Sequence, residues 1–263
     1  MEERLNAVSN MNKGPMTALV TGAGTGIGRG IAIRLAKEGY DVALHYRASA
    51  EGALSACDEI RTLGRKAIAI QADISDVKQI TAMFDECEEK LGPVDLFVNN
   101  AGITKKSPFL DTTEALFDNI CGVDFKGAYF CIQCAAKQMI KHGKQGSIVA
   151  ISSNNSRAHF AEVSVYGSVK AAMNKMVEHI ALEMAKYGIR VNTVAPGWVD
   201  TGASRLDDKE STFYKIPLKK WATVDDVAEA VIYLSSAKSV TGDTLIIDNG
   251  ALLLSDKLEK YGF

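Results

Sequence analysis

The chain has 263 residues, 47% of them hydrophobic, and a formal net charge of −2. A chain of this length can bury one sizeable core, and its near-neutral charge gives no electrostatic reason to bind nucleic acid or an anionic membrane. No apolar run approaches the ~18 residues that a membrane-spanning helix needs, and we expect no signal peptide because the first residues lack an apolar core.

In chain order, a polar stretch comes first and two kinds of segment then alternate. Residues 1–14 are expected to form a polar extension, and one domain is expected over 15–263. Apolar, β-rich runs predict strands at 18–20, 41–46, 67–71, 95–99, 147–151, 190–194 and 244–247. Helical periods predict helices at 27–38, 52–63, 77–91, 114–141, 165–187 and 224–235.

This alternation of strands and helices predicts an α/β fold. We expect a single doubly wound, Rossmann-like domain of about seven parallel strands, with helices on both faces of the sheet. Ligands of such domains bind at the carboxyl ends of the strands. Residues 197–223 show no clear period and follow the sixth predicted strand, so we expect them to form a lid.

A glycine-rich turn joins the first predicted strand to the first predicted helix. Its glycines would let the backbone approach a pyrophosphate, and the helix N-terminus would offer free N–H groups and a positive dipole end. The spacing is G-x-x-x-G-x-G rather than the commoner G-x-G-x-x-G. The turn residues expected to bind the cofactor are Gly22, Thr25, Gly26, Ile27 and Gly28.

The end of the second predicted strand bears on which nicotinamide cofactor is used. An acid there binds the ribose 2′-hydroxyl of NAD, whereas a basic residue accommodates the 2′-phosphate of NADP. Here the strand ends in Tyr46 and Arg47, and no acid follows before Glu51. We therefore favour NADP(H) over NAD(H); the alternative is that Arg47 is an ordinary solvated arginine.

Ser153, Tyr166 and Lys170 are spaced for moving a proton to or from a substrate oxygen. Hydride reduction of a ketone leaves an alkoxide, which a tyrosine hydroxyl can protonate. A nearby positive charge lowers the pKa of a phenol, and residues i and i+4 share a helix face, so Lys170 can supply that charge beside Tyr166. A serine hydroxyl from a strand end can hydrogen-bond the substrate oxygen.

These motifs together resemble the short-chain dehydrogenase/reductase family, in particular its 3-oxoacyl reductase-like and glucose dehydrogenase-like members. The resemblance runs from about Met16 to Ala251 and implies an NAD(P)-dependent oxidoreductase in which Ser153, Tyr166 and Lys170 are catalytic. It also implies further cofactor contacts from the strand ends, at Asp73, Ile74, Asn99, Ala101, Gly102, Pro196, Gly197, Val199 and Thr201, besides Tyr166 and Lys170 themselves.

One position departs from the family pattern. Where relatives carry a fourth catalytic residue, an asparagine in V-N-x-x-G, this chain has Asp124 within Val123 to Gly127. In relatives the main-chain carbonyl of that residue holds a water that links the lysine to solvent. Asp124 can still do so, but its carboxylate can also pair with Lys170 and weaken the effect of the lysine on Tyr166.

The five cysteines are irregularly spaced, so reduced thiols and a cytoplasmic location fit them best. Cys131 and Cys134 form a Cys-x-x-Cys, which in a helical stretch is better explained as two small apolar residues than as a redox pair. No second pair completes a zinc site, and the four histidines show no ligand spacing, so we expect no metal.

Substrate identity is the least determined property. Residues 154–160, with Trp198, Ser204 and Tyr214 of the expected lid, would line the pocket. Two asparagines and a histidine favour a small polar substrate such as a sugar, polyol or keto compound. A 3-oxoacyl thioester or a steroid is the alternative, and a non-catalytic dinucleotide-binding protein is a weaker one because Ser153, Tyr166 and Lys170 are all present.

Two predicted helices, 114–141 and 165–187, carry more apolar residues than one sheet face needs. We expect a second buried face, made by Ile132, Ala135, Ala136, Met139, Ala171, Met173, Met176 and Ile180. Relatives pair these helices across a two-fold axis and often form tetramers. We therefore expect a homotetramer, with a homodimer as the second possibility.

Overall fold

The protein is described here from a computed structural model, which covers residues 15–202, 212 and 215–253. The expected N-terminal extension and the pocket candidates Ser204 and Tyr214 lie outside these residues. Within the described ranges, no helix combines the length and apolar character required to traverse a bilayer.

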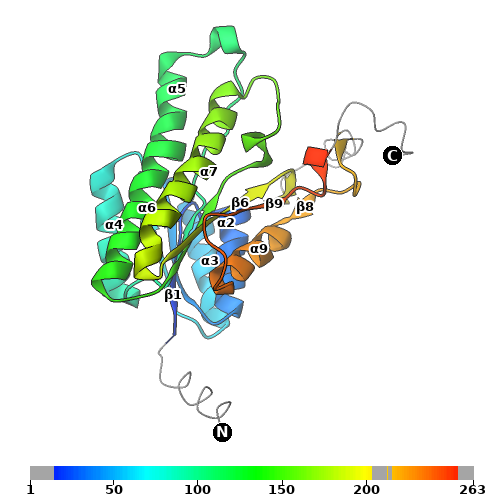
Figure 1. Cartoon of the computed structure of the whole chain (residues 1–263). Coiled ribbons are helices and arrows are strands. Elements are labelled where there is room, and N and C mark those ends of the chain that lie inside the picture. The colour runs from blue at the N-terminus through cyan, green and yellow to red at the C-terminus, as the bar shows by residue number, and fades with distance from the viewer. Residues whose placement is uncertain (1–14, 203–211, 213–214, 254–263) are drawn as a thin grey trace.

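A seven-stranded parallel sheet forms the centre of the domain (Figure 1). The strands are β1 (Thr17–Val20), β2 (Asp41–Tyr46), β3 (Ala67–Gln71), β4 (Leu96–Asn99), β5 (Ser147–Ile151), β6 (Arg190–Pro196) and β9 (Thr244–Ile247). Their spatial order is β3-β2-β1-β4-β5-β6-β9, and every neighbouring pair is parallel. The predicted doubly wound α/β domain is therefore confirmed, with all seven strands near their predicted positions.

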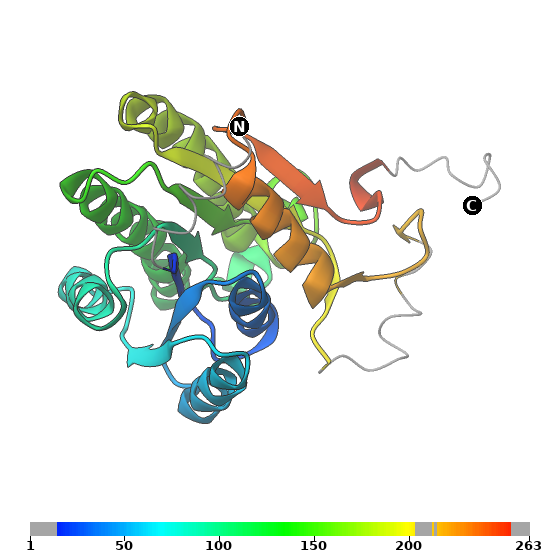
Figure 2. The ribbon, with the colours of Figure 1, turned by 90° about the horizontal axis from the view of Figure 1, so that it is seen from below.

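Helices cover both faces of the sheet, as Figure 2 shows. The longer ones are α2 (Gly26–Lys37), α3 (Ala50–Thr62), α4 (Val77–Leu91), α5 (Glu114–Cys121), α6 (Ala128–Lys141), α7 (Ser164–Met184) and α9 (Val224–Ser236). Short 3-10 helices are η1 (Phe109–Asp111), η3 (Asn154–Ser156), η4 (Ala185–Tyr187) and η6 (Ala251–Leu253). Burying both faces explains why the strands read as continuous apolar runs rather than alternating ones.

Each face of the sheet has its own apolar core. One core packs α4, α6 and α7 against the sheet and includes the edge-to-face pair Phe84 and Phe97, whose ring centroids lie 5.2 Å apart. The other packs α2, α3 and α9 against the opposite face, through side chains such as Leu35, Ile60 and Leu234. These two cores hold the carboxyl ends of the strands in a fixed relation to the helix N-termini.

The helix predicted over 114–141 does not have one regular pitch. A π-helical segment, η2 (Gly122–Gly127), separates α5 from α6. The backbone of Gly127 passes so close to the loop after β3 that a β-carbon there would lie 2.6 Å from the carbonyl oxygen of Ile74. This widened turn carries Asp124, which is fully buried. Such turns are frequent at functional sites.

The described part of 197–223 contains regular structure that the sequence did not predict. A two-stranded parallel ribbon pairs β7 (Val199–Asp200) with β8 (Ala222–Thr223). Two residues per strand are too few to produce a periodic pattern, which is why this ribbon escaped prediction.

The strand order changes direction between β1 and β4. From β1 the chain first adds strands on one side, to β3, and then returns to add β4 on the other. The helices leaving β1 and β4 therefore diverge, and a crevice opens at the carboxyl ends of these two strands. The glycine-rich turn lies at this point.

Candidate active site

A cavity of about 430 Å³ lies at the carboxyl ends of β1, β2 and β4. Twelve of the predicted cofactor residues line it: Gly22, Thr25, Gly26, Ile27, Gly28, Tyr46, Arg47, Asp73, Ile74, Ala101, Gly102 and Thr201. Sequence reasoning missed others, including His45, Ser49 and Asn100. The predicted turn and strand ends therefore converge on one site.

The glycine turn is shaped by close backbone approaches. Gly22 has φ of +66°, and a β-carbon there would lie 2.9 Å from Cα of Ala101. A β-carbon on Gly28 would lie 2.4 Å from both the Asn100 side chain and the carbonyl oxygen of Gly22. Only glycine fits these two positions without displacing the backbone.

Helix α2 begins at Gly26, directly after this turn, and has no acidic residue in its first turn. The unpaired N–H groups of a helix N-terminus attract anions. A cavity walled by exposed glycine backbone and by such an N-terminus fits the pyrophosphate of a dinucleotide, so the residues present are compatible with the predicted cofactor.

His45 connects the glycine turn to the sheet. Its Nδ1 accepts a hydrogen bond from the backbone N–H of Gly22 at 3.1 Å, and its Nε2 donates to the carbonyl of Ala72 at 3.0 Å. Burial lowers the pKa of His45 below its ordinary value, which favours the neutral ring that both bonds require. No sequence pattern indicates this role, because a lone histidine in a strand is usually only a core residue.

Arg47 lies at the end of the cavity predicted to hold adenosine, where it meets Asp73. Nε of Arg47 is 3.1 Å from Oδ2 of Asp73, and the arginine side chain is 62% exposed. Hydrogen bonds from Ser75, with the charge of Arg47, hold the pKa of Asp73 below its ordinary value. The two residues predicted to contact the adenosine are thus side by side, with the guanidinium reaching into solvent.

The two asparagines at the end of β4 have different positions. Asn99 is buried and does not line the cavity, and its side-chain atoms have no hydrogen-bond partner within the described residues. Asn100 instead lines the cavity, and its Nδ2 donates to the carbonyl of Thr21 at 2.9 Å. Asn100 therefore joins the loop after β4 to the glycine turn, a role that the prediction did not assign.

A second, smaller cavity of about 190 Å³ contains the predicted catalytic residues. Its lining includes Ser153, Tyr166, Lys170, Asp124, Pro196 and Gly197. Ile27, Asn100 and Gly102 line both this cavity and the larger one, so the two are neighbours. Of the remaining predicted cofactor residues, Val199 lies in β7 and packs against the core around α2 and α9.

Tyr166 and Lys170 project from the first two turns of α7. The Lys170 ammonium lies 5.5 Å from the ring centroid of Tyr166. Lys170 is buried, and its Nζ donates to the carbonyl of Ile151, at the end of β5, at 3.2 Å. The cation is therefore held beside the tyrosine ring by the sheet as well as by the helix.

Ser153 follows β5 by two residues and caps the short helix η3. Its Oγ accepts hydrogen bonds from the backbone N–H and from Nδ2 of Asn155, at 3.2 and 3.4 Å. Since both of these groups are donors, the hydroxyl hydrogen of Ser153 is available for a substrate oxygen.

Asp124 contacts the catalytic lysine. Its Oδ2 lies 3.1 Å from Nζ of Lys170, and the two side chains are 0% and 4% exposed. Its Oδ1 accepts a hydrogen bond from the backbone N–H of Ile103 at 2.8 Å. The pairing that the sequence left open is therefore present in this structure.

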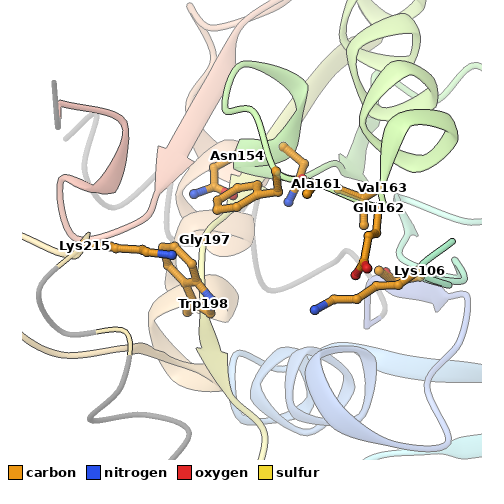
Figure 3. Close-up of a pocket in the computed structure, with 11 residues that line it drawn as sticks. Lys106, Asn154, Ala161, Glu162, Val163, Gly197, Trp198 and Lys215 are labelled. Carbon is orange, nitrogen blue, oxygen red and sulfur yellow. The ribbon is translucent and has the colours of Figure 1, made fainter. Parts of the chain in front are cut away.

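A third cavity, of about 430 Å³, shares Thr104 and Gly197 with the cavity of the predicted catalytic residues (Figure 3). Figure 3 shows Lys106 and Lys215 entering from opposite sides, with Trp198 below Asn154. The predicted pocket residues Asn154, Asn155, Phe160 and Trp198 line it, whereas Ser156, Arg157, Ala158 and His159 do not. The rings of Phe160 and Trp198 meet edge to face, 5.4 Å apart.

Several residues of this third cavity were not predicted. They come from the loop after β4 (Thr104 and Lys106) and from the segment before α7 (Glu162 and Val163). Glu162 has φ of +66°, an uncommon conformation for a residue other than glycine. No sequence pattern marks loops that meet only in the folded chain, so these positions required the structure.

All five cysteines are free thiols, and Cys131 is fully buried in α6. Burial raises the pKa of the Cys131 thiol well above its ordinary value. This agrees with the interpretation of Cys131 and Cys134 as packing residues. No group of three or more potential metal ligands occurs in the part of the chain that the structure describes.

Comparison with known proteins identifies the family. A family described as Enoyl-(Acyl carrier protein) reductase matches residues 22–251. The 3-oxoacyl-(acyl-carrier-protein) reductase FabG of Staphylococcus aureus is 37% identical, over 89% of this chain and 97% of that protein. The L-rhamnose 1-dehydrogenase (NAD(P)(+)) of a Sphingomonas strain is 38% identical, over 89% of this chain and 95% of that protein.

Solved structures of similar proteins agree with the sequence relatives. An acetoin dehydrogenase from Enterobacter cloacae superposes with a TM-score of 0.86 at 33% identity, covering 93% of this chain and 99% of that one. A short-chain dehydrogenase from Burkholderia cenocepacia in complex with NADP gives 0.84 at 35% identity, covering 90% and 97%.

The chain belongs to the short-chain dehydrogenase/reductase family. It is an NAD(P)-dependent oxidoreductase of this family, as the motifs predicted.

Proposed function

We propose that the enzyme interconverts a ketone and a secondary alcohol of a small polar substrate, with NADP(H) favoured over NAD(H). The observation that carries the proposal is the convergence of Ser153, Tyr166 and Lys170 on one cavity. That cavity adjoins both the glycine-rich cofactor cavity and the polar cavity around Asn154.

Each side chain has a role in moving the proton. The hydroxyl of Ser153 holds the substrate oxygen, since its lone pairs already accept from Asn155. Tyr166 gives a proton to that oxygen during reduction and removes it during oxidation. The Lys170 ammonium stabilises the phenolate form of the tyrosine. A bound nicotinamide supplies or accepts the hydride.

Arg47 supports the preference for NADP. It follows β2, where an acid would bind a ribose 2′-hydroxyl, and it reaches from the cavity wall into solvent, where a 2′-phosphate can meet it. The hydroxyl of Ser49 lines the same end of the cavity and makes no capping bond to α3. The complex of the Burkholderia cenocepacia relative with NADP agrees with this preference.

The cavity around Asn154 supports a polar substrate. Two asparagine amides, Glu162, Lys106 and Lys215 line it, against one aromatic wall. Nδ2 of Asn154 is buried without a hydrogen-bond partner among the described residues, so a substrate oxygen would satisfy it. Relatives named for acetoin and L-rhamnose act on small oxygenated molecules, which favours a sugar, polyol or keto compound.

A 3-oxoacyl thioester is the second candidate, because of the identity with FabG. The aromatic pair of Phe160 and Trp198 would provide its apolar contact.

We further propose a homotetramer, with a homodimer as the second possibility. The apolar face predicted from the sequence does not support an interface between copies. Six of its residues are buried in the core of the same chain: Ile132, Ala135, Ala136, Met139, Met173 and Met176. A different apolar surface supports the proposal. It is a groove of about 710 Å³ between α5 and α7 that includes Phe109, Phe117 and Phe125. A second copy of the chain would cover this groove.

Five free thiols fit a cytoplasmic location.

Substitution of Tyr166 by phenylalanine tests the proposed mechanism. Loss of a general acid–base group costs ~10²–10⁴-fold in rate, so Tyr166→Phe should lose most turnover on any substrate found in a carbonyl and alcohol panel. Cofactor binding, followed by NADPH fluorescence, should persist. Tyr233→Phe, at an exposed position on α9, is the matched control. Near-native turnover of Tyr166→Phe would refute the mechanism.

A further inference from the structure

The catalytic lysine shares its burial site with a carboxylate. Asp124 comes from η2 and Lys170 from α7, and their charged atoms lie 3.1 Å apart with both side chains almost inaccessible to solvent. In such surroundings an ion pair is weakly screened, so each charge acts strongly on groups next to it. Tyr166 is the neighbour that matters, because its ring centroid is 5.5 Å from the ammonium.

The position of Asp124 is specified by the fold. Oδ1 is fixed by the N–H of Ile103, and the π-helical turn directs the side chain inward. A β-carbon on Gly102 would lie 2.8 Å from Oδ2 and 3.3 Å from Nζ of Lys170. The absence of a side chain at Gly102 thus leaves room for both charges of the pair.

The contact is electrostatic rather than a directed hydrogen bond. Oδ2 has no hydrogen-bond donor in the described part of the chain, although Nζ of Lys170 is within ion-pair distance. The lysine directs a hydrogen instead at the carbonyl of Ile151. The carboxylate therefore opposes the charge of Lys170 without taking over its hydrogen bonds.

We infer that Asp124 is a positioning residue that sets the pH range of the enzyme, by opposing the field that Lys170 exerts on Tyr166. This rests on the proposed role of Tyr166 as the acid and base. A paired lysine stabilises the phenolate less than an unpaired one does. Oxidation, which needs the phenolate, is thereby moved to higher pH, and reduction, which needs the phenol, stays active into alkaline conditions.

Other charged and titratable groups come from the elements and the cavity next to Tyr166. On α7 the nearby group is Lys170. Helix α5 packs against α7 and carries Cys121, whose thiol pKa is raised chiefly by burial and then by the charges of Asp118 and Asp124. From the substrate side, Lys106 and Glu162 line the adjoining cavity. Of these groups, Asp124 is the buried anion in contact with the lysine, so its removal is the most direct test.

The first experiment compares pH–rate profiles for alcohol oxidation. Asp124→Asn keeps the size and the acceptor for Ile103 but removes the charge, so the rise in kcat/KM with pH should shift down by about one pH unit or more. Asp124→Glu, which keeps the charge, should keep the midpoint of the profile near that of wild type, whatever its maximal rate. Asp118→Asn removes an exposed charge from α5 and should leave the profile in place. An unshifted Asp124→Asn profile overturns the inference.

The second experiment needs neither substrate nor cofactor. Ultraviolet titration of tyrosinate, taken as the difference between each protein and its Tyr166→Phe counterpart, isolates Tyr166 in the wild type and in Asp124→Asn. The Tyr166 step should come at lower pH in Asp124→Asn. If Asp124→Asn does not fold, the difference titration between wild type and Tyr166→Phe decides. Ionisation of Tyr166 far below the pH of about 10 expected for a phenol would overturn the inference.

The two hypotheses fail differently. Near-native turnover in Tyr166→Phe would refute the catalytic role itself. A catalytically essential Tyr166 with identical titration in wild type and Asp124→Asn would refute only the role of Asp124.

Discussion

The guanidinium Nε of Arg47 lies 3.1 Å from Oδ2 of Asp73, at the end of the cavity predicted to hold adenosine. The pair is exposed on the arginine side, so it is screened by solvent and contributes little by itself. A 2′-phosphate, which carries more charge than a carboxylate, would compete well for this guanidinium. The contact therefore holds Arg47 near the predicted position of the ribose 2′ group, at which NADP and NAD differ.

Replacing Arg47 by alanine should separate the two cofactors. Charge-assisted hydrogen bonds contribute ~1.5–3 kcal/mol, so the KM for NADPH should rise roughly ten- to a hundred-fold while that for NADH stays nearly constant. Steady-state kinetics with both cofactors measure this. Arg61→Ala is the control, because that arginine is also ion-paired and exposed but lies outside the cavity. Equal effects on both cofactors, or a strong wild-type preference for NADH, would count against NADP.

His45 should make the glycine turn sensitive to acid. Its pKa is lowered in the folded state, so its contribution to stability is complete above the ordinary value of 6.5 and is lost as the pH falls below it towards the folded pKa. In His45→Asn, an amide oxygen can accept from Gly22 without titrating. Between pH 7 and 5 the wild type should lose more unfolding free energy than the variant, by at most about 1.4 kcal/mol per pH unit.

Denaturant titrations at several pH values measure that difference. His179→Asn is a suitable control, since His179 is exposed on α7 and lies far along the chain from the turn. Parallel pH dependence in wild type and His45→Asn would show that the buried ring does not carry the effect.

The predicted residues line common cavities because they lie in short, contiguous motifs at strand ends. Tyr166 and Lys170 share a helix face by spacing alone, and the glycines of the first turn are required by close backbone contacts that recur in this fold. A local sequence pattern is enough to predict such residues when they act within one turn of the chain.

The parts that escaped prediction depend on contacts between distant segments. The inward direction of Asp124 follows from a π-helical turn, and periodicity alone cannot distinguish that turn from regular helix. Lys106 and Glu162 reach the substrate cavity from two separate loops. Assigning apolar helix residues to an oligomer face failed for the same reason, because Met139 and Met173 are equally suited to the core of their own chain.

Glu88 should contribute to stability in a pH-dependent way. Its carboxylate joins α4 to α6 by accepting from Lys141 at 2.7 Å and from His142 at 2.8 Å, and these bonds lower its pKa to about 2. Because the pKa of Glu88 is lowered in the folded state, its carboxylate stabilises the fold above the ordinary carboxyl pKa of 4.5. This stabilisation is lost as the pH falls towards about 2.

Glu88→Gln should therefore be less stable than wild type at pH 7, by about 1 kcal/mol after allowing for solvent screening. The difference should shrink progressively below pH 4.5. Chemical denaturation at pH 7 and pH 3 gives both values. Glu89→Gln, a neighbouring change on the same helix, is the control, and a wild-type advantage that persists unchanged at pH 3 would exclude the proposed linkage.

The groove between α5 and α7 should determine the oligomeric state. Phe117 is 50% exposed and lines this groove with Phe109 and Phe125, a large apolar surface for a lone subunit. Phe117→Glu would place a charge in the contact, and a buried unpaired carboxylate is costly. Light scattering at micromolar concentration should give four times the 28.3 kDa chain mass for wild type and a smaller species for the variant. Leu54→Glu, at a 54% exposed position on α3, should assemble normally. A wild-type mass of one chain would refute the tetramer.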